Sequence, residues 1–189
     1  MTQALETVSQ TFMFSGVQSV YRHKSMATNT EMEFSVFVPD HGEHIRLPVL
    51  YYLSGLTCNW ENFTTKAGVQ RYAAEHGVII VAPDTSPRGN AVPDDETYDF
   101  GQGAGFYVNA TESPWQEHFQ MYEYIVNELP PIIEINFQND PARVGIFGHS
   151  MGGHGALTIA LKNPAIFKSV SAFSPIVAPS QVPWGERAF

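Results

Sequence analysis

Short runs of apolar residues along this chain predict the strands of a sheet. Residues 30–39 alternate between apolar side chains, such as Phe34 and Val36, and polar ones. This alternation predicts a half-exposed strand, antiparallel to its neighbour and lying at the edge of the sheet. Continuous apolar runs predict strands covered on both faces. These runs lie at 48–53, 78–82 and 144–147, with a weaker one at 169–173.

Helical periodicity separates these strands. An apolar stripe predicts one helix over residues 61–76, ended by Gly77, and another over 115–129, broken by Pro130 and Pro131. A third helix is expected from Ser150 to about Asn163. Strands that alternate with helices predict an α/β fold, with a mostly parallel central sheet and helices on both faces. The length of 189 residues favours a single domain over residues 1–189.

The segment from Pro83 to Pro114 has no periodicity and is dense in Gly, Pro, Asp and Asn. Loops longer than about 12–15 residues are uncommon in compact domains and are often functional. This one follows a strand at the edge of the sheet where α/β folds bind ligands. Because Phe100, Phe106 and Tyr107 would be costly to leave in water, we expect an ordered wall of the substrate entrance rather than a floppy insertion.

Charge and cysteine content narrow the function classes. The formal net charge of −9 argues against nucleic acid or an anionic membrane as partner, and an anionic substrate would need local positive charge. Cys58 is the single cysteine, so no internal disulfide can form. The first ten residues lack the features of a signal peptide, and no apolar run is long enough to span a membrane. A cytoplasmic protein is therefore expected.

The sequence Gly148-His149-Ser150-Met151-Gly152 carries the clearest chemistry. It stands between a predicted buried strand and a predicted helix, which is the layout of a nucleophile elbow. Ser150 is the expected nucleophile. The flanking glycines avoid collisions at the sharp turn. Two further glycines, at 153 and 155, would let the helix lie close to the sheet.

Attack by a serine on a carbonyl creates an oxyanion that needs N–H donors. The backbone N–H of Met151, at the start of the helix, is one candidate. The turn after the strand 48–53 supplies the second, which we assign to Leu56, with Gly55 as the neighbouring alternative. None of the seven histidines is placed as the base, and no spacing of His, Cys, Asp and Glu indicates a metal site. The histidines are His23, His41, His44, His76, His118, His149 and His154.

Several blocks in order resemble the S-formylglutathione hydrolase family, also called the esterase D family. The likeness runs from about Tyr21 to Phe189. The blocks are Leu53-Ser54-Gly55-Leu56-Thr57-Cys58, Ala82 to Gly89, Gly101 to Ala110, Gly148 to Ala156, Ser171 to Ile176 and Pro183-Trp184-Gly185.

This resemblance implies an α/β-hydrolase fold and a cytoplasmic serine hydrolase without metal or cofactor, usually a homodimer. The implied reaction cleaves S-formylglutathione to glutathione and formate in formaldehyde detoxification, with a short-chain carboxylesterase side activity. Members of the family continue beyond the equivalent of Phe189, and the acid and histidine of their triad lie there. The C-terminal part of the fold is therefore expected to be missing from this chain.

The resemblance also suggests a substrate site around Gly55, Cys58, His149 and Trp184. Trp184 is expected to wall a tight acyl pocket, so that Trp184→Ala would change the preference for acyl length, and alkylation of Cys58 is expected to slow turnover. Lys66 and Arg88 are the nearest cations for the glutathione carboxylates. The alternatives are another esterase of the same fold, or a non-catalytic binding module that keeps the elbow but lacks the triad.

Overall fold

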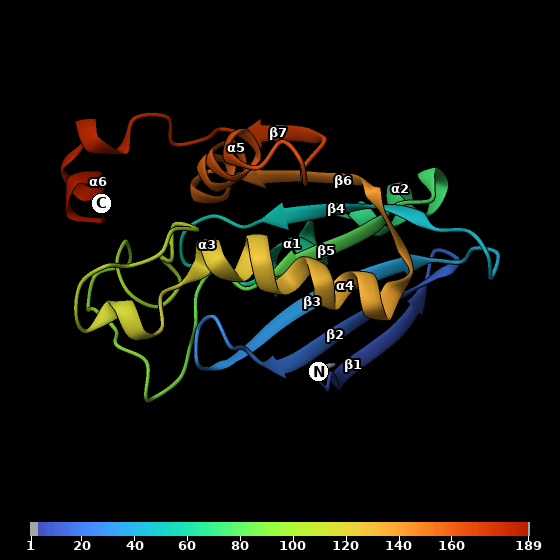
Figure 1. The fold of residues 1–189 in the computed structure, drawn as a ribbon, viewed down its shortest axis with the longest axis horizontal. Helices are drawn as coiled ribbons and strands as arrows, with labels where there is room; N and C mark the ends of the chain where they lie inside the picture. Colours follow the sequence, from blue (N-terminus) through green and yellow to red (C-terminus); the bar gives the residue numbers. More distant parts are fainter. Residues whose placement is uncertain (1–3, 189) are drawn as a thin grey trace.

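This computed structural model describes residues 4–188 of the chain. At its centre is a seven-stranded sheet (Figure 1). The strand order across the sheet is β1-β2-β3-β5-β4-β6-β7. The strands are β1 (Glu6–Met13), β2 (Gly16–Lys24), β3 (Glu31–Pro39), β4 (Leu47–Leu53), β5 (Ile79–Pro83), β6 (Asn139–His149) and β7 (Ser169–Phe173).

The sheet is mixed, with three parallel and three antiparallel pairings. Strands β5, β4, β6 and β7 run parallel, as the continuous apolar runs predict. Strands β1, β2, β3 and β5 pair antiparallel, so the expectation of a mostly parallel sheet holds for one half of it. β3 is antiparallel as expected, but it lies inside the sheet between β2 and β5 and is largely buried, so its placement at the edge was wrong.

Helices cover both faces of the sheet, as expected (Figure 1). α1 and α2 pack on one face over Phe37 and Ile80, while α4 and α5 pack on the other over Val49 and Ile146. The helical segments are α1 (Trp60–Lys66), α2 (Val69–His76), η1 (Trp115–Glu117), α3 (Met121–Glu123), η2 (Tyr124–Glu128), α4 (Leu129–Phe137), α5 (Met151–Lys162), η3 (Pro179–Gln181) and α6 (Pro183–Ala188).

Two of the predicted helices differ from the observed ones. The helix expected over 61–76 is split at Gly68, which has a φ of 62° and separates α1 from α2. The stripe over 115–129 becomes a 3-10 turn, a short α-helix and a π-helical turn, and the chain then continues through Pro130 and Pro131 into α4. The prolines do not break the helix, because they lie where the π-helical turn η2 passes into α4 and the backbone stays helical through both segments.

The segment after β5 is ordered without helix or strand over residues 84–114. Thr85, Ser86 and Tyr107 are fully buried within it. Asp84 is buried too, and Arg88 Nε donates to its two carboxylate oxygens at 3.0 and 2.9 Å. Arg88 Nη2 also donates to the Cys58 carbonyl oxygen at 3.0 Å. The floppy alternative is therefore wrong, since this segment is fastened to the turn that follows β4.

Arg88→Gln should lower stability, and more at neutral than at acidic pH. Burial raises the pKa of Asp84, and the Arg88 guanidinium partly offsets this. A raised folded-state pKa means that the folded chain binds more protons than the unfolded one, so stability falls as pH rises through that pKa. Without Arg88 the ionised carboxylate loses its partner. We expect a loss of about 1–3 kcal/mol at neutral pH, since Arg88 is partly solvated, and less near about pH 4, in chemical denaturation. An equal loss at both values would contradict this.

Candidate active site

Ser150 stands at the junction of β6 and α5 with an unusual backbone. Its φ of 57° and ψ of −119° lie outside the region that non-glycine residues normally adopt. Its N–H donates to the carbonyl oxygen of Phe173 on β7 at 3.0 Å, and the His154 N–H donates to its carbonyl oxygen at 3.1 Å. These bonds hold the strained turn in place, which is the geometry of a nucleophile elbow.

Glycines make this turn possible by letting backbone segments touch. A side chain at Gly148 would overlap the carbonyl oxygen of Gly152, and one at Gly152 would overlap the carbonyl oxygen of Leu53. Further along α5, a Cβ on Gly155 would come 2.6 Å from the ring of Tyr107. The steric reason inferred from the sequence for these glycines is confirmed.

The turn after β4 lies directly against the elbow. β4 and β6 are parallel neighbours with Leu53 opposite Gly148, so both strands end at the same edge of the sheet. A Cβ on Gly55 would lie 3.3 Å from the Cβ of Ser150. The long loop braces this turn, because the Tyr107 hydroxyl donates to the Ser54 carbonyl oxygen at 2.9 Å. The Thr57 N–H donates to the carbonyl oxygen of Gly103, in the same loop, at 3.0 Å.

The backbone N–H groups of Leu56 and Met151 are the two candidate oxyanion donors. Neither has a hydrogen-bond acceptor among residues 4–188. Met151 opens the 12-residue helix α5, so the positive end of the helix dipole reinforces its N–H. Met151 directly follows Ser150, and Leu56 follows Gly55, whose added Cβ would lie 3.3 Å from the Cβ of Ser150. Two such donors, if both point at one oxygen, would stabilise a negative charge on it.

No base reaches Ser150 within the described part of the chain. The Ser150 Oγ makes no hydrogen bond over residues 4–188. The histidine rings that make hydrogen bonds make them to other groups. His154 Nδ1 lies 2.8 Å from the Ile176 carbonyl oxygen, and His118 Nδ1 lies 2.9 Å from that of Thr28. His23 is buried and pairs with the Tyr124 hydroxyl at 3.0 Å. Over residues 4–188, the elbow and the two candidate donors are thus present, and no histidine is hydrogen-bonded to the Ser150 Oγ.

A cavity of about 230 Å³ opens beside the elbow. It brings together Gly55, Cys58 and His149, three of the four residues expected to bind substrate. The fourth, Trp184, lies in α6, and its side chain is outside the described residues. The cavity is lined by Tyr52, Ser54, Gly55, Cys58, Asn62, Phe63, Lys66, Ala67 and His149.

The two candidate cations have different surroundings. Arg88 is committed to Asp84 and to the Cys58 carbonyl oxygen, so it fastens the loop instead of facing a ligand. Lys66 lines the cavity beside the elbow. Sequence position alone did not separate them, because the Asp84–Arg88 pair forms only when the loop folds back on the turn after β4.

Comparison with known proteins places the chain in a family. A family model named Esterase matches residues 25–188. An S-formylglutathione hydrolase from Paracoccus denitrificans is 57% identical over all 189 residues of this chain, which cover 68% of that relative. The chain belongs to the S-formylglutathione hydrolase family. The expected resemblance and the α/β-hydrolase fold are both confirmed.

Solved structures agree with this S-formylglutathione hydrolase assignment. An S-formylglutathione hydrolase from Agrobacterium tumefaciens superposes with a TM-score of 0.94 at 54% identity, over 97% of this chain and 66% of that one. The serine hydrolase FphF from Staphylococcus aureus, at 20% identity and a TM-score of 0.70 over 88% of this chain and 60% of that one, shares the fold. The chain thus spans about two thirds of the length of its S-formylglutathione hydrolase relatives.

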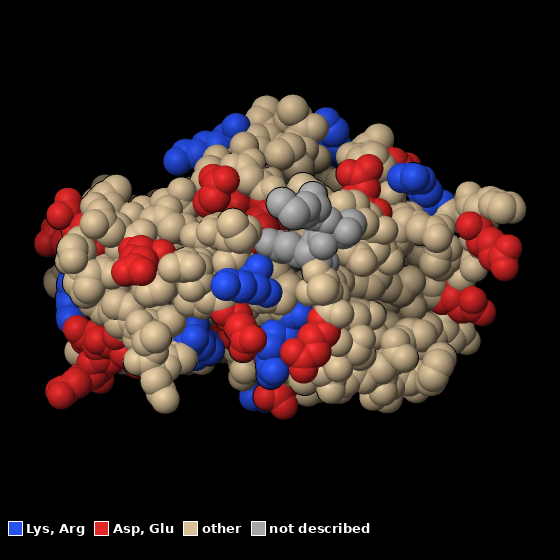
Figure 2. All heavy atoms as spheres, turned by 60° about the horizontal axis from the view of Figure 1, so that its bottom comes forward, with Lys and Arg blue, Asp and Glu red and all other residues tan. Residues whose placement is uncertain are grey.

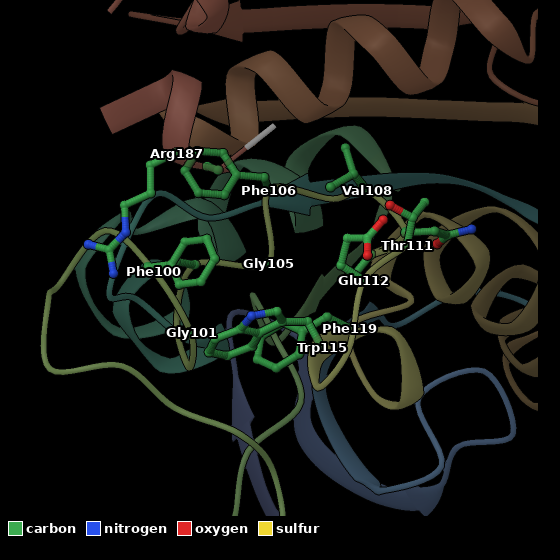
Figure 3. A pocket seen from close by; sticks show the side chains of 14 residues that line it. Phe100, Gly101, Gly105, Phe106, Val108, Thr111, Glu112, Trp115, Phe119 and Arg187 are labelled. Carbon is green, nitrogen blue, oxygen red and sulfur yellow. The ribbon is translucent and has the colours of Figure 1, made fainter. Parts of the chain in front are cut away.

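The long loop of this chain lines a second, apolar cavity of about 320 Å³ (Figure 3). Rings from Phe100, Phe106, Trp115 and Phe119 gather there. Arg187 from α6 lies over the Phe100 ring at 4.9 Å and pairs with Asp95 at 2.7 Å. The loop forms a pocket wall as expected, although Ser150 does not line this cavity. The aromatic content of residues 100–119 was the signal for it.

The surface carries mixed charge on the face shown in Figure 2, where Lys and Arg side chains lie among Asp and Glu. Across residues 4–188 no helix combines the length and apolar character needed to cross a membrane. In the same range no group of His, Cys, Asp and Glu side chains is arranged to hold a metal ion.

Proposed function

We propose that this chain carries the nucleophile and the oxyanion donors of a serine thioesterase that hydrolyses S-formylglutathione to glutathione and formate. One observation carries the proposal. Ser150 occupies a strained elbow at the start of α5, in a chain that is 57% identical to an S-formylglutathione hydrolase. The proposal includes short-chain carboxylester hydrolysis as a side activity, a cytoplasmic location, a homodimer, and no metal or cofactor.

The reaction follows from this geometry. The Ser150 Oγ attacks the formyl carbon while a base takes its proton, and the carbonyl oxygen becomes an oxyanion that accepts hydrogen bonds from Leu56 and Met151. The carbon–sulfur bond then breaks, and the thiolate of glutathione leaves with the proton from the base. Water, deprotonated by the same base, attacks the formyl ester of Ser150, releasing formate and returning the proton to the serine.

The base and the acid that orients it are proposed to come from the third of the relatives' length that this chain does not match. This assignment is supported by the absence of a histidine at Ser150 Oγ over residues 4–188. Cys58 and the Trp184 side chain are proposed to restrict the acyl site to a formyl-sized group.

The test joins residues 1–189 to the remaining third of the Paracoccus denitrificans relative and measures formate release from S-formylglutathione. We expect the chimera to turn over the thioester. The 189-residue chain alone should be slower by about 10⁴–10⁶-fold, the range for loss of a triad member. A chimera that folds but hydrolyses neither S-formylglutathione nor p-nitrophenyl acetate would refute the function.

A non-catalytic binding module is the second candidate, favoured by the absence of a base at Ser150 over residues 4–188. A fluorophosphonate probe separates the two. A hydrolase forms a covalent adduct on Ser150 in the chimera, whereas a binding module binds without any adduct. Mass spectrometry of the tryptic peptide that contains Ser150 gives the answer.

A further inference from the structure

We propose that Lys66 binds the glycyl carboxylate of the glutathione thioester, in the 230 Å³ cavity beside the elbow. This inference rests on the proposed function and names the part of the substrate that this cavity takes. The sequence does not distinguish Lys66 from Arg88, nor the glycyl carboxylate of glutathione from the γ-glutamyl one. The inference selects one of each.

Lys66 lines the cavity that begins beside the nucleophile elbow. Gly55 lines the same cavity as Lys66. A Cβ added to Gly55 would lie 3.3 Å from the Cβ of Ser150. A ligand that fills this cavity therefore reaches from the turn beside the nucleophile to the last turn of α1. Pockets that enclose whole drug-sized ligands run to about 300–1,000 Å³, so this smaller cavity suits one arm of a tripeptide.

Lys66 is the lysine that gives this cavity a positive charge. Over residues 4–188 the Lys66 ammonium has no ion pair or hydrogen bond, and its exposed side chain is available to a ligand. In a chain with a net charge of −9, an anion needs such a local cation to overcome the overall field. Arg88, the other candidate, is already paired with Asp84.

The composition of the lining decides between the two arms of glutathione. The γ-glutamyl arm carries an α-ammonium beside its carboxylate, so a site for it needs an acidic partner as well as a cation. No Asp or Glu lines this cavity, and Lys66, Asn62 and His149 are its polar side chains together with Ser54, Tyr52 and Cys58. The glycyl arm carries a carboxylate alone, which matches a lining of this kind.

The experiment measures binding, so it does not depend on turnover. Isothermal titration compares S-methylglutathione with its glycyl monoethyl ester on the wild-type chain, Lys66→Gln, Lys66→Arg and Lys24→Gln. Lys24 is the matched control, an exposed lysine at the end of β2. We expect Lys66→Gln to weaken S-methylglutathione about three- to tenfold, Lys66→Arg to retain most of the affinity, and Lys24→Gln to change nothing. The ester should bind wild type and Lys66→Gln alike.

Three outcomes overturn the proposal, and a fourth separates it from the proposed function. If Lys66→Gln binds S-methylglutathione as tightly as wild type, or if the ester is weakened equally, Lys66 does not hold the glycyl carboxylate. If Lys24→Gln weakens binding as much as Lys66→Gln does, the effect is general electrostatics and the site is wrong. If the wild-type chain binds neither compound, the glutathione assignment of the proposed function fails together with this one.

Discussion

Ser150→Ala should abolish the hydrolysis of S-formylglutathione by the chimera, with kcat lowered by about 10⁴–10⁶-fold. The reason is that Ser150 carries the hydroxyl at the strained turn between β6 and α5, where the candidate donor Met151 begins the helix. The remaining rate would come from these donors and from substrate binding. Steady-state kinetics with S-formylglutathione and p-nitrophenyl acetate measure the loss on both substrate classes.

A matched variant separates this chemical effect from a structural one. Thr158→Ala also removes one hydroxyl group, from the helix α5 that follows Ser150. The Thr158 hydroxyl donates to the Gly155 carbonyl oxygen within that helix at 3.1 Å. This variant should keep kcat within about threefold, since that helical bond contributes about 1 kcal/mol to stability and lies outside the candidate site. Substantial turnover in a folded Ser150→Ala chimera, or a comparable loss in Thr158→Ala, would show that Ser150 is not the nucleophile.

Gly152→Ala should destabilise the protein by about 3 kcal/mol or more, the largest stability effect expected of a single methyl group here. The added Cβ would overlap the backbone of Leu53 and Ser54, and a methyl group attached directly to the backbone cannot rotate away from them. β4 and α5 would have to separate, and the elbow would lose its geometry with them. Urea denaturation followed by circular dichroism measures the loss.

Gly153→Ala is the control for Gly152→Ala on the same helix. Its added Cβ would come 3.1 Å from the Cβ of Pro175 and 3.2 Å from the carbonyl oxygen of Gly148, two contacts that a shift of a few tenths of an ångström relieves. A helical alanine also gains roughly 1 kcal/mol over glycine, so the net change should be small. If Gly152→Ala proved as mild as Gly153→Ala, the close packing of α5 on the end of β4 would be contradicted.

The sequence was most informative where a local pattern and the tertiary contact have the same cause. β4, β5 and the second half of β6 are buried or half-buried on both faces, so their apolar runs were continuous and easily recognised. The elbow was recognised because the backbone of Leu53 lies against Gly152 and leaves no room for a side chain. The neighbouring position of Gly55 followed from parallel strands ending at one edge of the sheet.

The missed features depend on contacts that no local pattern encodes. β1 is exposed along nearly its whole length, so no apolar face marked it as a strand or showed that β3 would be internal. The π-helical turn at Tyr124–Glu128 and the entry of Pro130 into α4 leave no periodic trace. Arg88 looked like a ligand-binding cation because its partner, Asp84, is brought to it by the fold of the loop.

The hydrogen bond from the Ser150 N–H to Phe173 has a consequence for protein synthesis. The acceptor lies on β7, which the ribosome makes after the elbow and after the whole of α5. At about 5–20 residues per second, the stretch from Ser150 to Phe173 takes roughly one to five seconds to translate. A nascent chain that ends within α5 therefore has its serine but lacks the bond that holds the turn, so the reactive geometry forms late in translation.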